Sequence, residues 1–182
     1  VGRARRVRTV PADYVMPEGG VHGRLMGPPV GQEVRLQRNK LPAVHALARA
    51  NRIDRIEIDS PRSRIGIVTT GKSYLYTRQA LAALGIDDKA AAKLGIRLYK
   101  IGLAWPLEPQ GALRFASGLE KLIVIEEKRS FIEAQLKDIL YDVPAAARPV
   151  ICGKRDQAGN ELLSSLGELD AAQVARALAR FE

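Results

Sequence analysis

The sequence predicts an α/β fold in which a mostly parallel sheet lies between two layers of helices. From Arg64 onward, segments with strand character alternate with segments with helix character, as in β-α repeats. Residues 122–125 are apolar at every position, which indicates a strand buried on both faces. Gly85 and Asp170 are helix-end signals, the first a C-terminal cap and the second an N-terminal cap.

The first segment of the chain, residues 1–42, is rich in proline and glycine. Proline has no backbone N–H to donate, so we expect an extended arm that holds no long helix and no central strand. A short helix is expected only at 31–38. We expect the arm to lie on another surface, anchored by four apolar side chains: Tyr14, Val15, Leu25 and Met26.

The remaining elements follow from local patterns. A helix is expected at 41–51, where Pro42 falls in the first turn and Asn51 marks the end. The run RIEIDSP, 55–61, alternates apolar and polar residues like a half-exposed strand. Further strands are expected at 65–70, 96–102, 121–126 and 148–152, and helices at 73–84, 109–117, 130–141 and 171–180. We therefore predict two parts: residues 1–50, an arm or linker with short helices, and residues 51–182, an α/β domain.

Composition excludes several functional classes. The net charge is +9, but four arginines within the first eight residues supply +4, and the other charges mix both signs. Aromatic residues make up only 5% of the chain, so we expect no nucleic-acid partner. One cysteine and two histidines cannot build a disulfide, a zinc site or an iron–sulfur site.

The expected location is the cytoplasm. No apolar stretch of about 18 residues or more is present, and no signal peptide is visible, so we expect no membrane segment. The chain begins with valine, from which we expect a piece of a longer polypeptide.

The segment GIVTTGKS, residues 66–73, matches the consensus of a nucleotide-binding P-loop. A P-loop needs its four middle residues to curl around phosphate oxygens, but here they are β-branched and favour a strand. Residues 60–65 before it have turn chemistry. We interpret the segment as a strand, a turn at Gly71 and a helix from about Ser73. A P-loop nucleotide-binding protein remains the alternative hypothesis.

Two polar loops are expected at the carboxyl edge of the sheet, where ligands of open α/β folds bind. Lys72 either holds an anion together with the helix N-terminus or is solvated. Glu126 and Glu127 act either as a general base or subunit contact, or as ion-pair partners of nearby cations. The candidate residues are Thr70, Gly71, Lys72, Ser73, Glu126, Glu127, Lys128 and Arg129.

No catalytic constellation is visible in the sequence. Cys152, His22 and His45 lie in different segments, so no nucleophile is paired with a base. We assign no catalytic residue and no metal ligand. Trp105, before a proline, suits either the core or an exposed interface.

Several long strings resemble the indolepyruvate ferredoxin oxidoreductases, members of the 2-oxoacid:ferredoxin oxidoreductase family, in their fused bacterial form. They are IDSPRSRIGIVTTGKSYLYTRQALAALGID at 58–87, GIRLYKIGLAWPLEP at 95–109, LIVIEEKRSFIEAQLKDILYD at 122–142 and GELDAAQVARAL at 167–178. The arm string MPEGGVHGR also fits. The resemblance implies a domain shaped like a transketolase C-terminal domain, with a five-stranded sheet in the order 1-3-2-4-5 and an antiparallel first strand.

The resemblance also implies the activity of the full enzyme. Such enzymes decarboxylate indolepyruvate or other aryl pyruvates oxidatively, using thiamine diphosphate, Mg²⁺, iron–sulfur clusters and coenzyme A, and reduce ferredoxin. This chain lacks the GDG…N signature for Mg²⁺ and diphosphate, and Cys152 alone cannot hold a cluster. We therefore expect no cofactor in this fragment and no activity of the fragment alone. Its expected partners are other domains of the same polypeptide, within a homo-oligomer.

The implied strand order makes a further prediction about the two loops. It places the strands that end at Thr70 and Glu126 side by side. The hypothesis is that Lys72 and Arg129 meet Glu126 or Glu127 in a surface crevice used for subunit contact or anion binding.

Overall fold

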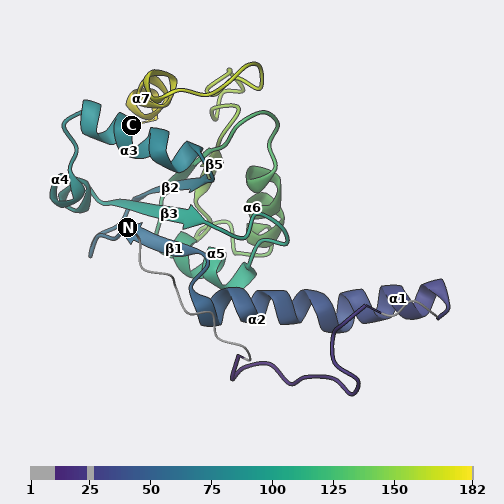
Figure 1. The fold of residues 1–182 in the computed structure, drawn as a ribbon. Coiled ribbons are helices and arrows are strands. Elements are labelled where there is room, and N and C mark those ends of the chain that lie inside the picture. The colour runs from purple at the N-terminus through teal and green to yellow at the C-terminus, as the bar shows by residue number, and fades with distance from the viewer. Residues whose placement is uncertain (1–10, 24–26, 182) are drawn as a thin grey trace, which may run out of the picture. The chain divides into compact units, whose positions relative to one another are not determined.

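The computed structural model describes residues 11–23 and 27–181 of the chain (Figure 1). The chain divides into two compact units, residues 1–53 and residues 54–182. The second unit contains the sheet and the helices that cover it.

The sheet has five strands in the order β1-β3-β2-β4-β5. Strand β1 pairs antiparallel with β3, and the other neighbours pair in parallel. The strand order and the antiparallel first strand agree with the prediction. The strands are β1 Arg55–Ile58, β2 Ile65–Thr70, β3 Ile96–Ile101, β4 Lys121–Ile125 and β5 Val150–Cys152.

Helices cover both faces of this sheet. Ile67 of β2 belongs to an apolar cluster with residues of α3 (Ser73–Ala83) and α7 (Ala171–Arg180). The next residue, Val68, belongs to a cluster on the other face with residues of α5 (Pro109–Ala116) and α6 (Ile132–Leu140). Successive strand residues point to opposite faces, so β2 is buried on both sides. The predicted three-layer α/β/α architecture is thus confirmed.

Two predicted helix ends are present and one helix was not predicted. Gly85, with φ +73°, follows the last turn of α3, and Asp170 forms a capping box with Gln173 at α7. The helix that was missed is α4, Asp88–Lys93. It is too short for apolar periodicity to reveal, and it is started by the Asp87 carboxylate, which accepts a hydrogen bond from the Ala90 N–H at 2.7 Å.

The first unit corrects the expectation that residues up to 42 hold no long helix. Helix α1 (Pro29–Arg35), the π-helix η1 (Leu36–Lys40) and α2 (Leu41–Asn51) follow one another without a break. Pro29 occupies the first helical position, where its missing N–H is harmless. The wider π-turn lies directly before Pro42, and the Leu41 N–H bonds back to Leu36. Such a bulge accommodates a proline that would otherwise break the α-helical ladder.

The described part of the predicted arm contacts its own helices. The Tyr14 hydroxyl donates to the Asn39 carbonyl at 2.8 Å, and Asp13 pairs with Arg49 at 2.7 Å. Val15 is 90% exposed. The other two expected anchors, Leu25 and Met26, lie outside the described residues, as do the first arginines of the chain.

Candidate functional site

The P-loop match lies in regular strand structure. Residues 67–69 pair with β3 on one side and β4 on the other, so Ile67 lies beside Leu98 and Ile123, and Thr70 pairs with β3. Their backbone N–H groups serve sheet ladders and cannot surround a phosphate. This geometry excludes the P-loop alternative.

Gly66 has a packing role in this strand. A Cβ atom built at Gly66 would overlap the side chains of Leu119 and Phe115 beneath α5. The first glycine of the motif is therefore required by the core.

Lys72 at the start of α3 is engaged by carboxylates. Its Nζ atom lies 3.2 Å from Oε1 of Glu127 and 3.6 Å from Oε2 of Glu168, and 5.4 Å from the centroid of the Tyr76 ring. The hydrogen bond with Glu127 raises the pKa of Lys72 above its usual value. Two carboxylates beside the ammonium group favour the ion-pair interpretation and oppose binding of a further anion.

Glu126 does not form the expected ion pair with Lys72 or Arg129. Its side chain is buried, and its carboxylate accepts hydrogen bonds from three backbone N–H groups at the start of α6. The distances are 3.0 Å to Phe131, 2.7 Å to Ile132 and 3.0 Å to Glu133. Glu126 thus satisfies the free N–H groups of a helix N-terminus, an environment that favours a carboxylate.

The two cations of the loop after β4, Lys128 and Arg129, differ in their contacts. Lys128, with φ +57°, donates from Nζ to the Gly167 carbonyl. Arg129 is exposed and makes no ion pair within the part of the chain that the structure describes. We define the edge cluster as Lys72, Glu127, Lys128 and Glu168, which joins the two predicted loops to the segment before α7.

A buried lysine beside this cluster, Lys154, was not predicted from the sequence. Lys154 is only 9% exposed, and its Nζ atom donates to the carbonyls of Glu126 at 2.6 Å and Ser164 at 3.4 Å. Desolvation by burial lowers the pKa of Lys154. The backbone N–H of Lys154 donates a hydrogen bond to Glu133 Oε2 at 3.1 Å. The only signal in the sequence was a lysine two residues after a short apolar strand, which is too common to single out.

The residues with catalytic potential lie in different units of the chain. Cys152 is buried on β5, and burial raises the pKa of its thiol. His45 lies in α2, in the other unit. No group of three or more His, Cys, Asp or Glu side chains suited to a metal ion occurs among the described residues. The described residues therefore do not supply the ligands of an iron–sulfur cluster.

Two other structural observations bear on the predictions. Trp105 is 58% exposed, so it is not a core residue of this chain. No helix in the described ranges is long and apolar enough to span a membrane.

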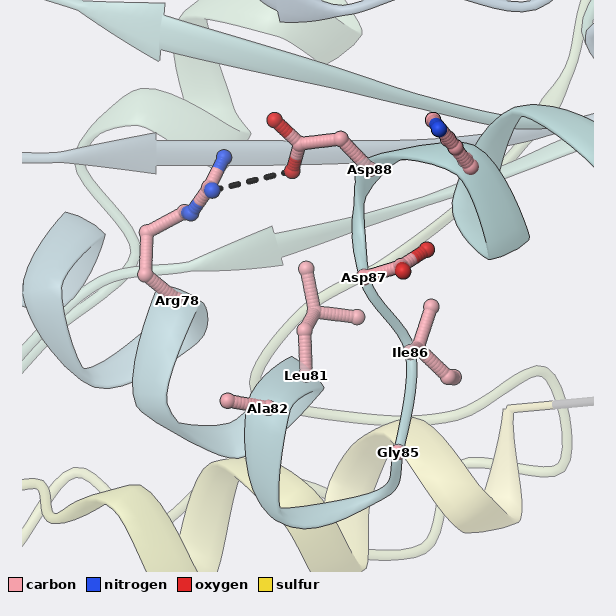
Figure 2. A pocket seen from close by; sticks show the side chains of 8 residues that line it. Arg78, Leu81, Ala82, Gly85, Ile86, Asp87 and Asp88 are labelled. Carbon is pink, nitrogen blue, oxygen red and sulfur yellow. Dashed lines mark ion pairs between the residues drawn. The ribbon is translucent and has the colours of Figure 1, made fainter.

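A cavity of about 650 Å³ lies between the end of α3 and the start of α4 (Figure 2). Arg78 and Asp88 form an ion pair of 2.9 Å at its border. The carboxylate of Asp87 is engaged in capping α4. Arg78 and Asp88 thus neutralise each other, and Asp87 is occupied in holding the helix.

Fold and site together define an α/β domain whose carboxyl edge is closed by internal ion pairs and a helix cap. The family model of the indolepyruvate oxidoreductase domain matches residues 55–181, and the chain belongs to this family.

Curated relatives are much longer than this chain. The chain is 32% identical over 120 residues to the indolepyruvate oxidoreductase subunit IorA of Thermococcus kodakarensis, which is 65% of this chain and 16% of that protein. It is 36% identical over 87 residues to IorA of Pyrococcus horikoshii, or 47% of this chain and 12% of that protein. The chain thus spans a small part of the relatives that it matches.

A solved oxidoreductase structure shares the fold. A 2-oxoglutarate:ferredoxin oxidoreductase from Magnetococcus marinus aligns over 86% of this chain and 24% of that chain, with a TM-score of 0.52 and 16% identity. A split-gene transketolase aligns over 70% of this chain and 40% of that chain, with a TM-score of 0.46 and 18% identity.

Proposed function

We propose that this chain is a structural and assembly domain of a larger thiamine-diphosphate-dependent 2-oxoacid:ferredoxin oxidoreductase that decarboxylates indolepyruvate or other aryl pyruvates oxidatively. Membership of the indolepyruvate oxidoreductase domain family supports the class of enzyme. The small share of the IorA relatives that the chain covers supports its place as one domain among several. Residues 1–50 would serve as the arm or linker, and residues 51–182 as the domain.

One observation carries the non-catalytic role. The carboxyl edge of an open α/β sheet is the usual place for a ligand. Here the polar side chains of that edge hold the protein itself: Glu126 caps α6, and Lys72 pairs with Glu127. Thiamine diphosphate, Mg²⁺, iron–sulfur clusters and coenzyme A would be held by other domains of the polypeptide. Ferredoxin would accept the electrons, in a cytoplasmic homo-oligomer.

The first test is the size of the natural polypeptide. An immunoblot of the source cell with an antibody against this domain should show a band several times larger than the 19.9 kDa of this chain. A band at the size of this chain would contradict the proposal.

The second test addresses the edge cluster, which we propose as a contact to another domain or subunit. Lys72→Ala in the complete polypeptide should lower the assembled fraction about fivefold or more in size-exclusion chromatography, because Glu127 and Glu168 would be left as uncompensated negative charges at the proposed contact. Turnover per assembled complex should not change. Lys93→Ala, which removes an exposed lysine of α4, is the matched control. Wild-type assembly, turnover and anion binding in Lys72→Ala would refute the contact.

A further inference from the structure

A second cavity, of about 430 Å³, lies at the amino edge of the sheet. The first residues of three neighbouring strands line it: Ile65 of β2, Ile96 of β3 and Lys121 of β4. The cavity is therefore at the opposite end of the strands from the edge cluster, and no residue is shared between them. Its volume falls in the range of small-molecule sites, roughly 300–1,000 Å³.

The wall of this cavity is aliphatic. Besides Ile65, Ile67 and Ile96 of the strands, it includes three leucines: Leu84 from the segment after α3, Leu94 after α4 and Leu178 on α7. Leu84 is 41% exposed and Leu94 is 56% exposed, so large apolar side chains stand in water here. Covering them with an apolar ligand would be favourable, at about 25 cal/mol for each Å² removed from water.

Among the described residues, one cation that lines the cavity makes no ion pair. Arg64 and Glu120 neutralise each other through two hydrogen bonds, of 2.7 and 2.8 Å. Lys121 donates a hydrogen bond to the uncharged backbone carbonyl of Phe181. Its Nζ atom also lies 5.0 Å from the centroid of the Phe181 ring. No carboxylate of a described residue lies within ion-pair distance of Lys121. The lining therefore carries a net charge of +1 beside an aliphatic wall, and Lys121 retains N–H groups to donate.

We propose that this cavity binds an amphipathic carboxylate with an aliphatic chain, such as a medium-chain fatty acid. The chain packs against the isoleucine and leucine side chains, and the carboxylate pairs with Lys121. This inference rests on the cavity alone and is independent of the proposed function. Insertion of an apolar segment of another protein chain is the competing occupant.

The first experiment titrates the 182-residue chain with octanoate and with octanamide, which has the same tail and an uncharged head. Binding is followed by amide chemical shifts in ¹H–¹⁵N correlation spectra and by calorimetry. Shifts should cluster at Ile65, Ile96 and Leu178, and octanoate should bind about three- to tenfold tighter than octanamide, as a partly exposed ion pair allows. Equal affinities would overturn the assignment of the carboxylate. A lack of saturable binding would overturn the proposal in favour of a protein segment.

The second experiment uses variants that separate the charge from the cavity. Lys121→Met should weaken octanoate about three- to tenfold and leave octanamide unchanged, which also shows that the cavity still forms. Ala179→Trp, at an exposed lining position of α7, should abolish binding of both probes. Ala172→Trp places the same side chain at an exposed α7 position outside the lining and is the control. Equal binding by the two tryptophan variants would overturn the site.

Discussion

At the scale of single residues, Glu126 and Glu127 show how one chemical type takes two roles at adjacent positions. Glu126 is 3% exposed and accepts three backbone hydrogen bonds, whereas the Glu127 side chain is 29% exposed and pairs with Lys72. Both were predicted as candidates, and no local pattern separates them. The two roles differ because Glu126 continues the buried register of β4 and its carboxylate meets the first turn of α6.

The same substitution at both positions tests this difference. Glu126→Gln should lower the free energy of unfolding by about 2–3 kcal/mol, because an amide NH₂ group would face a backbone N–H donor inside the protein. Glu127→Gln should cost less than about 1 kcal/mol, as expected for a partly exposed ion pair. Urea unfolding of both variants at pH 7 gives the two values. Equal losses would show that Glu126 is not the buried cap of α6.

At the scale of elements, β2 was predicted correctly although its sequence matches a phosphate-binding loop. The β-branched residues at 67–70 decide the conformation, since they fit a pleated strand and resist a tight loop. By contrast, the helix at 41–51 was predicted, but its unbroken continuation back to Pro29 was not. Its continuity depends on the π-turn η1, and a choice between π- and α-turns is not written in local propensity.

Gly66 provides the test at this scale. Gly66→Ala should destabilise the protein by about 1–3 kcal/mol, because the added methyl group overlaps Leu119 and Phe115 in a packed core. Gly23→Ala is the control, since a Cβ atom there meets no other atom within 4 Å, and it should change stability by less than about 0.5 kcal/mol. Thermal or urea unfolding measures both. If Gly66→Ala were as stable as the wild type, the result would refute the close packing of Gly66 in β2 against Phe115 of α5 and Leu119.

At the scale of the whole molecule, a buried polar network joins β4, α6 and the segment after β5. Burial acts to raise the pKa of Glu133, but hydrogen bonds from Lys137, the Lys154 N–H and Ser130 outweigh it, and the pKa lies below its ordinary value of 4.5. A carboxyl group whose pKa is lower in the folded state stabilises the fold above the unfolded pKa. That stability is lost as the pH falls through the folded pKa.

The contribution of Glu133 to the free energy of unfolding should therefore be constant between pH 7 and 5.5 and should decrease below about pH 4.5. Glu133→Gln should be less stable than the wild type at pH 7, and the difference should shrink toward pH 3 because the wild-type carboxyl is then protonated. Urea unfolding of both proteins at pH 7, 5.5 and 3 measures the change. A difference that is independent of pH would mean that the charge of Glu133 contributes nothing to the network.

The sequence by itself determined the layers of this protein, because burial on two faces, alternation of strands with helices and helix caps are local patterns along the chain. The resemblance to a family supplied the strand order, which the structure shows. Only the tertiary structure decided the partners of Lys72 and Lys154, which come largely from other segments of the chain, and the turn that brings the Glu126 carboxylate to the first N–H groups of α6. It also decided the amino-edge cavity, because a cavity is the space left between packed elements and has no sequence pattern of its own.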